Sequence, residues 1–366
     1  MGLGVGIVGL PNVGKSTTFN ALTKAQNAEA QNYPFCTIEP NKAIVPVPDI
    51  RLNELAKIVN PERIQHSTID FVDIAGLVRG ASKGEGLGNQ FLSNIRDVEV
   101  ILHMVRCFED ENITHVEGVI DSIRDIEIIE SELIFADIDQ LNKKIEKLTR
   151  QAKADKDAKA ALEVAQDLAT HLDELKPVST YEGKENPHFI ALSKELRFLS
   201  NKPIIYGANV DEDGLLEDNS FVVALKEHAS KVGADVIVLC AKLEEEMVGL
   251  AEDEAQEFMN ELGIKQSGLD NIIRTAFAKL NLISYFTAGV KEVRSWTIKK
   301  GWLAPKAASV IHNDFEKGFI RAEVIAYEDF IANKGENGAK EAGKMRLEGK
   351  EYEVKDGDVM HFRFNV

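Results

Sequence analysis

A glycine-rich segment near the amino terminus constrains this chain more than any other feature of its sequence. It reads GLPNVGKS at residues 9–16 and fits the pattern GxxxxGK(S/T) in full. A short apolar run at residues 3–9 precedes it, and a helical pattern at 16–24 follows, so the segment joins a strand to a helix. In that context the pattern predicts a loop whose backbone N–H groups surround phosphates at a helix amino terminus.

Each part of this loop has an expected task. Lys15 reaches the β- and γ-phosphates, where its charge makes it a candidate catalytic residue, and the hydroxyl of Ser16 ligates Mg²⁺. The glycines allow the backbone to approach the phosphates closely. We therefore expect nucleotide contacts from Gly9, Asn12, Val13, Gly14, Lys15, Ser16 and Thr17.

A second motif, DIAG at residues 73–76, directly follows a candidate strand at 67–73. Asp73 is expected to hold Mg²⁺, and the N–H of Gly76 to sense the γ-phosphate. Between the two motifs lies Thr37, which is either a further Mg²⁺ ligand or an ordinary loop threonine. At this distance beyond the phosphate loop, the DxxG pattern favours a hydrolytic switch over a kinase.

The residue after Gly76 is Leu77, so the glutamine that orients the attacking water in many GTPases is absent at that position. The following segment, 79–89, is dense in glycine and is expected to change order with the nucleotide. Two water-positioning groups are conceivable. One is His115, which is otherwise a surface histidine without a role; the other is K⁺ held by Asn12, which is otherwise a loop-stabilising amide.

The base-binding motif NKxD of GTPases has one plausible counterpart, NVDE at residues 209–212. Val210 replaces the lysine that stacks on guanine, and Glu212 stands in the fourth position. Asn209 carries both a donor and an acceptor and suits adenine, while Val210 can pack on either base. The residues alone therefore leave both ATP and GTP open.

Apolar runs at 98–105, 203–208 and 235–240 alternate with helical patterns, which is typical of an α/β fold with a mostly parallel sheet. Heptad-like spacing interrupts this alternation and predicts an antiparallel helical hairpin. After about residue 280 the pattern suggests a small α+β domain. The expected domains are a nucleotide-binding domain at 1–127 and 200–280, a helical insert at 128–199, and a C-terminal domain at 281–366.

The chain carries 43 basic and 60 acidic residues, a formal charge of −17, which opposes general binding to nucleic acid, and nothing indicates sequence-specific DNA recognition. One stretch is locally basic, at residues 143–159, and is either a solvated helix face or a contact for an RNA-rich partner. Three dispersed cysteines indicate a reduced, cytoplasmic protein, and no apolar run is long enough to span a membrane.

Together these segments resemble the YchF/Obg-like ATPase family, and the similarity extends over nearly the whole chain. It rests on the motifs at residues 9–17, 35–41, 73–78, 80–91 and 209–212, and on segments at 285–294 and 312–321 that are similar to a TGS domain. The resemblance implies a G domain with an inserted helical hairpin and a ubiquitin-like β-grasp module at the carboxyl end.

The same resemblance implies function. The family prefers ATP and associates with ribosomes. Its members have a hydrophobic residue in place of the catalytic glutamine, and Leu77 matches this feature. His115 matches a loop histidine proposed to assist hydrolysis. The expectation is a Mg²⁺-dependent ATPase that acts as a nucleotide-controlled switch on the ribosome or a ribosomal subunit. The alternatives are a GTPase of the same fold and a ribosome- or RNA-binding module with incidental hydrolysis.

Overall fold

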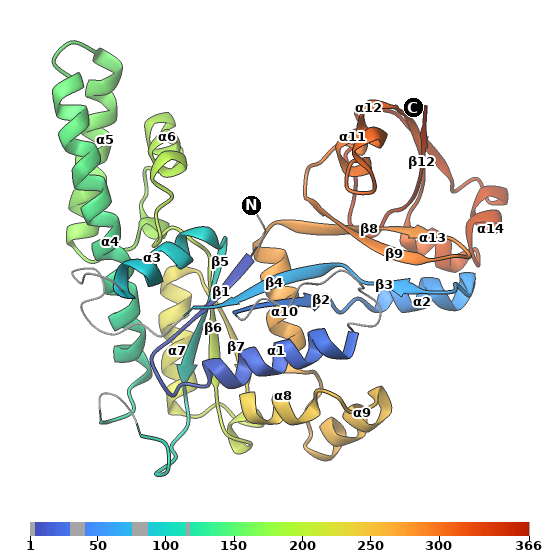
Figure 1. Ribbon diagram of the computed structural model, residues 1–366, viewed down its shortest axis with the longest axis horizontal. Helices are drawn as coiled ribbons and strands as arrows, with labels where there is room; N and C mark the ends of the chain where they lie inside the picture. Colours follow the sequence, from blue (N-terminus) through green and yellow to red (C-terminus); the bar gives the residue numbers. More distant parts are fainter. Residues whose placement is uncertain (1–3, 30–40, 75–86, 115–117, 366) are drawn as a thin grey trace. The chain divides into compact units, whose positions relative to one another are not determined.

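The computed structural model describes residues 4–29, 41–74, 87–114 and 118–365 (Figure 1). Contacts divide the chain into two units. The first unit comprises residues 1–24, 38–43 and 70–272, and the second comprises 25–37, 44–69 and 273–366. The predicted α/β architecture, with a helical insert and a second small domain, is confirmed. The domain limits expected from the sequence stay a prediction.

A six-stranded sheet forms the centre of the first unit. In spatial order its strands are β2 (Lys42–Pro46), β4 (Thr68–Asp73), β1 (Gly4–Val8), β5 (Val100–Arg106), β6 (Ile204–Asn209) and β7 (Asp235–Leu239). From β4 to β7 every neighbouring pair is parallel. The carboxyl ends of these five strands therefore lie along one edge, which is where ligands bind in open α/β sheets.

The helices follow the strands along the chain. Apart from the helical insert, the helices that lie wholly or partly in the first unit are α1 (Lys15–Glu29), α3 (Leu87–Asp97), α7 (Ser220–Val232), α8 (Ala241–Met247), α9 (Glu252–Glu261) and α10 (Gly268–Lys279). Val222 and Leu225 of α7 are fully buried and pack, with Ile126, against Tyr206 and Ala208 of β6. Every residue of β6 from Ile205 to Asn209 is buried, so both faces of the strand are covered. Such strands read as continuous apolar runs, which is why the sequence revealed them.

The helical insert consists of α4 (Ser122–Gln151) and α5 (Lys156–Asp173), which lie side by side in Figure 1, and a third helix, α6 (Pro187–Leu196). Apolar residues at heptad-like spacing form its core, including Ile134, Leu141, Leu148, Ala165, Leu168 and Leu172. Phe189 and Leu192 of α6 join the same cluster. The sequence analysis missed α6, because polar and proline-containing flanks obscure its short apolar face.

Asp137 of α4 ties the insert to the chain that leads into β6. It is fully buried, and its carboxylate accepts hydrogen bonds from the N–H groups of Leu199 and Ser200, both at 2.8 Å, and from the Ser200 hydroxyl at 2.7 Å. We expect Asp137→Ala to lower the free energy of unfolding by about 3 kcal/mol, because it leaves two buried N–H groups unpaired. Urea denaturation measures this.

The matched control is Asp139→Ala, which removes an exposed carboxylate from the same helix two residues away. It should change the unfolding free energy by less than about 0.5 kcal/mol. Equal effects of the two substitutions would show that the loss of helix charge, and not the buried hydrogen bonds, governs this site.

The second unit contains the other sheet. Its strands, in spatial order, are β11 (Arg346–Glu348), β10 (Phe319–Ile325), β12 (Val359–Phe364), β8 (Leu282–Ala288), β9 (Val293–Lys299) and β3 (Ile64–Gln65). Its helices are α2 (Ile50–Val59), α11 (Ala304–Ala308), α12 (Asn313–Lys317), α13 (Tyr327–Ala332) and α14 (Glu336–Glu341). None of the helices in the described ranges combines the length and apolar composition needed to cross a bilayer.

The helix α2 belongs to the core of this unit. Leu52 and Leu55 are fully buried in a cluster with Phe286 of β8 and Phe330 of α13. A ten-residue amphipathic helix fits many apolar surfaces, so its sequence does not reveal which core it enters. This association of a segment from the first 70 residues with the C-terminal strands was not anticipated from the sequence.

Candidate functional site

The phosphate-loop motif lies between β1 and α1, as predicted. Two of its glycines have backbone conformations that favour glycine, with φ of 152° at Gly9 and 98° at Gly14. A Cβ atom at Gly9 would lie 2.6 Å from the carbonyl oxygen of Met104, and one at Gly14 would lie 2.2 Å from Nδ2 of Asn209. Both contacts are prohibitively close, so the turn that precedes α1 requires glycine at both positions.

Lys15 is the first residue of α1, and its ammonium group turns back onto the loop. Its Nζ donates a hydrogen bond to the carbonyl oxygen of Leu10 at 3.2 Å. Burial lowers the pKa of Lys15, and the nearby Asp73 carboxylate partly offsets that shift. A bound phosphate would supply a stronger negative partner and favour the charged ammonium. The side chain is thus placed to respond to an anion at the loop.

Asp73 ends β4 and lies in the electrostatic range of Lys15. Its backbone N–H donates to the carbonyl oxygen of Asn41 at 2.9 Å. Its Oδ1 atom is buried and has no hydrogen-bond partner in the described part of the chain. Burial raises the pKa of this carboxyl group, while Lys15 opposes the shift. A buried, unpaired carboxylate oxygen beside the phosphate loop fits a Mg²⁺ ligand, direct or through water.

The structure describes some of the other predicted site residues but not all of them. Ser16 is exposed on the first turn of α1, and Thr17 is partly buried next to it. The remaining predicted positions lie outside the described residues; they are Thr37, Gly76, Leu77 and His115. For these residues the roles stay predictions.

The structure gives Asn12 a partner within the protein. Its Nδ2 donates a hydrogen bond to the carbonyl oxygen of Thr114 at 3.1 Å, so the phosphate loop holds the loop that follows β5. This bond is of the kind expected for a loop-stabilising amide. Binding of K⁺ by the Asn12 carbonyl oxygen stays a prediction.

Arg106, at the end of β5, is a contributor that the sequence analysis missed. Its guanidinium is almost fully buried and donates to the carbonyl oxygens of Phe108, Asp110 and Ile113 at 3.1, 3.1 and 2.9 Å. The group also lies 4.7 Å from the centre of the Phe108 ring. Arg106 therefore shapes the loop at 108–113. An arginine that ends a buried, mostly apolar strand was the available signal.

A cavity of about 630 Å³ adjoins the phosphate loop, a volume within the usual range for small-ligand sites. Four loops at the carboxyl ends of the parallel strands line it, with residues drawn from 12–17, 108–113, 209–213 and 240–242. Val210 lies in its wall and is 2% exposed. The expected base-binding segment and the phosphate loop therefore border one cavity.

Asn209 connects three of these loops. Its Nδ2 donates to the carbonyl oxygen of Val13 at 3.1 Å, and its Oδ1 accepts from the N–H of Ala241 at 2.9 Å. Its backbone carbonyl accepts from the N–H of Cys107 at 2.8 Å. The amide thus has a positioning role that the sequence did not suggest. Reading of the base by Asn209 stays a prediction.

Comparisons with known proteins agree with this geometry. Residues 4–194 match a family model described as a 50S ribosome-binding GTPase, and residues 282–365 match the YchF-GTPase C-terminal model, described as a protein of unknown function. Over the full length of both chains, the protein is 58% identical to a "Ribosome-binding ATPase YchF" of Haemophilus influenzae and 54% identical to that of Bacillus subtilis. The chain belongs to the YchF family.

A solved structure supports YchF membership at the level of the fold. It is described as the Schizosaccharomyces pombe YchF GTPase, with 39% identity and a TM-score of 0.89, and the match covers 99% of this chain and 97% of that one. The family resemblance inferred from the motifs is thereby confirmed. The names of these relatives imply different nucleotides: the Haemophilus influenzae and Bacillus subtilis proteins are called ATPases, and the Schizosaccharomyces pombe protein is called a GTPase.

Proposed function

We propose that this protein is a Mg²⁺-dependent ATPase that binds the ribosome and uses the nucleotide as a conformational switch. The observation that carries the proposal is the placement of Lys15 within electrostatic range of Asp73, whose buried Oδ1 has no hydrogen-bond partner in the described part of the chain, beside a glycine-dependent turn. The Lys15 ammonium suits an anionic phosphate, and the Asp73 carboxylate suits a cation. A ligand that contains a phosphate and a bound cation would therefore fit both groups.

In this proposal Lys15 binds the β- and γ-phosphates and stabilises the charge that develops on them during hydrolysis. Asp73 and Ser16 would hold Mg²⁺, with Thr37 as a further ligand, and the bound ion supplies electrostatic stabilisation of the phosphates. Loop N–H groups, including that of Gly76, bind the phosphate oxygens. Because Leu77 cannot orient water, His115 or K⁺ held by Asn12 takes that task.

ATP is preferred because the base segment lacks the features that select guanine. Val210 replaces a stacking lysine. The carboxylate of Asp211 accepts a hydrogen bond from the N–H of Gly214 at 3.0 Å and is engaged within its own turn. We expect Mg·ATP to bind at least about tenfold more tightly than Mg·GTP, a free-energy difference of about 1.4 kcal/mol.

Isothermal titration calorimetry of the purified full-length chain with each nucleotide measures this preference. The Lys15→Ala variant provides the baseline without a functional phosphate loop. Tight binding of GTP together with weak binding of ATP would replace this assignment by the GTPase alternative.

The proposal that the protein binds the ribosome rests on the names of the relatives and on the basic stretch of the helical insert. Lys143, Lys147 and Arg150 are exposed and spaced along one face of α4. Lys144 is different, because it pairs with Glu195 of α6 at 2.6 Å. We propose that the exposed cations contact ribosomal RNA. A protein that binds ribosomes in this way would act in the cytoplasm. The proposal involves neither DNA nor a membrane as a partner.

Replacing Lys143, Lys147 and Arg150 with alanine should weaken cosedimentation with ribosomes. Each lost phosphate contact should reduce the slope of log K against log salt by about 0.7–0.9. The control replaces Lys334, Lys340 and Lys350, exposed residues of the second unit, which changes the net charge equally. Equal losses in both variants would indicate a net-charge effect without a specific surface.

Ribosome cosedimentation with ADP and with a non-hydrolysable ATP analogue tests the switch itself. Preferential docking in one nucleotide state is the expected result. Equal docking in both states would support the alternative of a ribosome-binding module with incidental hydrolysis.

A further inference from the structure

The helix α4 extends without interruption from the sheet of the first unit to the hairpin that it forms with α5 (Figure 1). Its 30 residues correspond to a length of about 45 Å. Ile126, in its second turn, is fully buried in a cluster with Cys107, which directly follows β5, and with Val210, which lines the nucleotide cavity. The other end of α4 carries the exposed cations assigned to RNA. One helix therefore connects the surroundings of the cavity to the basic face.

Asp125, next to Ile126 in α4, is a buried charge. It is 2% exposed, and its Oδ1 accepts a hydrogen bond from Nη2 of Arg124 at 3.1 Å. Its carboxylate also lies in the electrostatic range of the Arg106 guanidinium. Charged side chains are almost never buried without a partner of opposite charge. The burial of Asp125 is therefore compensated by two arginines, one on α4 and one at the end of β5.

Arg106 contacts the wall of the nucleotide cavity. Its guanidinium holds three carbonyl groups of the loop at 108–113, and this loop contributes four lining residues to the cavity: Phe108, Glu109, Asp110 and Ile113. Burial lowers the pKa of Arg106, and the carboxylates of Asp110 and Asp125 oppose this shift. The guanidinium is thus bonded to the cavity wall and stabilised by a charge on α4.

Two buried charges of opposite sign respond to movement more strongly than an apolar contact does. Water screens the attraction between buried charges much less than it screens surface pairs, so a change in their separation changes the energy appreciably. The apolar contact between Ile126 and Cys107 has no preferred direction. A shift of the loop that moves Arg106 therefore changes the energy of Asp125 and of the turn of α4 that carries it.

We propose that Arg106 and Asp125 form a buried charged link that couples nucleotide binding in the cavity to α4, and thereby to the basic face at the other end of that helix. This inference rests on the proposed function, since it extends the nucleotide switch to the helical insert. Arg106 is a positioning residue in this scheme, because it acts through the loop at 108–113.

The link has two states. Without nucleotide, Arg106 and Asn12 hold the loop after β5. A bound nucleotide adds contacts from the cavity and restricts the loop further, and the link passes this restriction to the first turns of α4. Coupling is reciprocal, so RNA bound at the basic face changes the nucleotide affinity by the same factor by which nucleotide changes the RNA affinity.

Hydrogen exchange followed by mass spectrometry tests the link in the full-length chain. Exchange is compared without nucleotide, with Mg·ADP and with a non-hydrolysable ATP analogue, and calorimetry measures binding of each nucleotide to the same protein. Amides of residues 122–135 in α4 should exchange at least about threefold more slowly when nucleotide is bound.

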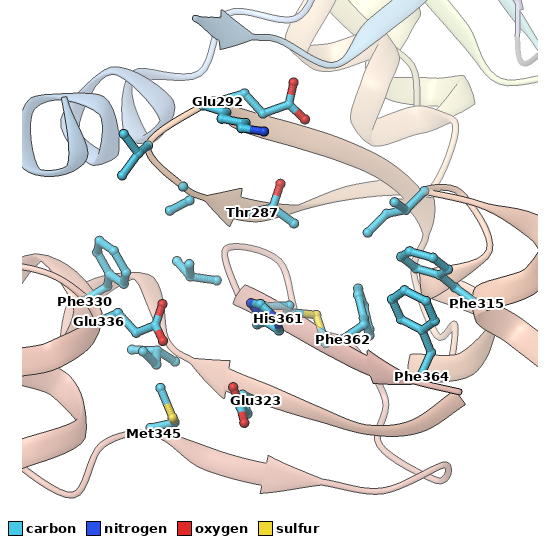
Figure 2. Close-up of a pocket in the computed structure, with 18 residues that line it drawn as sticks. Thr287, Glu292, Phe315, Glu323, Phe330, Glu336, Met345, His361, Phe362 and Phe364 are labelled. Atoms are coloured by element: carbon cyan, nitrogen blue, oxygen red, sulfur yellow. The ribbon is translucent and has the colours of Figure 1, made fainter. Parts of the chain in front are cut away.

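Peptides from the second unit provide an internal reference. Strands β8 and β12 border a separate cavity of about 500 Å³, which Figure 2 shows between Thr287 on one strand and His361 and Phe362 on the other. None of the residues that line it lines the nucleotide cavity. Exchange in these two strands should not change when nucleotide binds.

Asp125→Asn separates coupling from binding, because it removes the charge on α4 and Asp125 does not line the cavity. The variant should bind nucleotide within about threefold of the parent affinity but should lose most of the slowing at α4. The matched control is Glu127→Gln, which removes an exposed carboxylate two residues further along the same helix and should keep the full response. Thermal unfolding confirms that both variants are folded.

Arg106→Met removes the other charge together with three hydrogen bonds to the loop. It should weaken nucleotide binding about tenfold, because the cavity wall loses its support, and at saturating nucleotide it should also lose most of the slowing at α4. If the two residues act as one link, the Arg106→Met/Asp125→Asn double variant behaves like Arg106→Met alone. Independent structural roles would instead give losses that add.

Four outcomes would overturn the inference. Nucleotide binding that leaves exchange in α4 unchanged would show that no coupling reaches the helix. A full response in Asp125→Asn, or an equal loss in Glu127→Gln, would show that this carboxylate is not the link. Equal slowing in β8 and β12 would indicate general stabilisation of the chain. Absence of nucleotide binding by the parent protein would overturn the proposed function as well.

Discussion

Lys15→Ala is expected to reduce ATP turnover by at least about 100-fold and to abolish measurable stabilisation by Mg·ATP. The ammonium is the cationic side chain of the phosphate loop, and loss of a group that stabilises developing charge typically costs a factor of this size. Without nucleotide, the variant should be as stable as the parent protein or slightly more stable. The reason is that burial already lowers the pKa of Lys15, so its charge is held at a cost.

Two measurements check this prediction, steady-state phosphate release and the shift of the thermal midpoint with Mg·ATP. The control is Lys24→Ala on the same helix, which removes an exposed lysine paired with Glu245 at 3.1 Å. It should retain turnover and the nucleotide-dependent shift. Unchanged turnover in Lys15→Ala would refute the assignment of the phosphate site.

Asp73→Asn should lower ATP turnover by a comparable factor and raise the Mg²⁺ concentration needed for half-maximal activity. Asparagine keeps the shape of the side chain but removes the charge that favours a divalent cation. The apparent Mg²⁺ requirement, measured at saturating ATP, is the decisive readout. An unaltered requirement would exclude Asp73 as a Mg²⁺ ligand.

The same substitution has a pH signature in the protein without nucleotide. Folding raises the pKa of Asp73, so the ionised carboxylate is less stable in the folded chain than in the unfolded one. Stability from this group is fully present below its unfolded pKa and is lost as the pH rises through the higher folded value. Asp73→Asn should therefore gain stability relative to the parent above this range and none below it.

A control on the same strand separates this effect from general charge removal. Asp70→Asn removes a carboxylate that pairs with Lys42 at 2.9 Å. It should leave the Mg²⁺ requirement unchanged and should not reproduce the gain in stability. A gain of equal size in both variants would assign the effect to net charge.

The sequence was most informative where structure depends on residues close together in the chain. The turn at residues 9–16 needs glycine for its backbone angles, and the strand and helix that flank it follow from local periodicity. Heptad spacing likewise revealed α4 and α5, because the two helices bury their apolar faces against each other. In these places one segment, or two adjacent ones, contains both sides of the interaction.

The sequence was least informative where a residue acts through distant partners. Arg106 organises the loop at 108–113 through three carbonyl groups, and Asn209 joins loops that follow three different strands. The short helix α6 was missed because its apolar face can be recognised only from its packing against the hairpin of α4 and α5. Backbone carbonyls and close packing have no signature in residue type.

By itself, the sequence determined the kind of ligand and the class of fold, since phosphate binding and alternating strands and helices depend on local pattern. Only the tertiary structure decided which core α2 enters, how Asn209 connects the loops of the cavity, and which strands become neighbours in each sheet. An alternating apolar pattern identifies a strand but not its neighbours. Which strands pair depends on all the strand edges that the folded chain brings together.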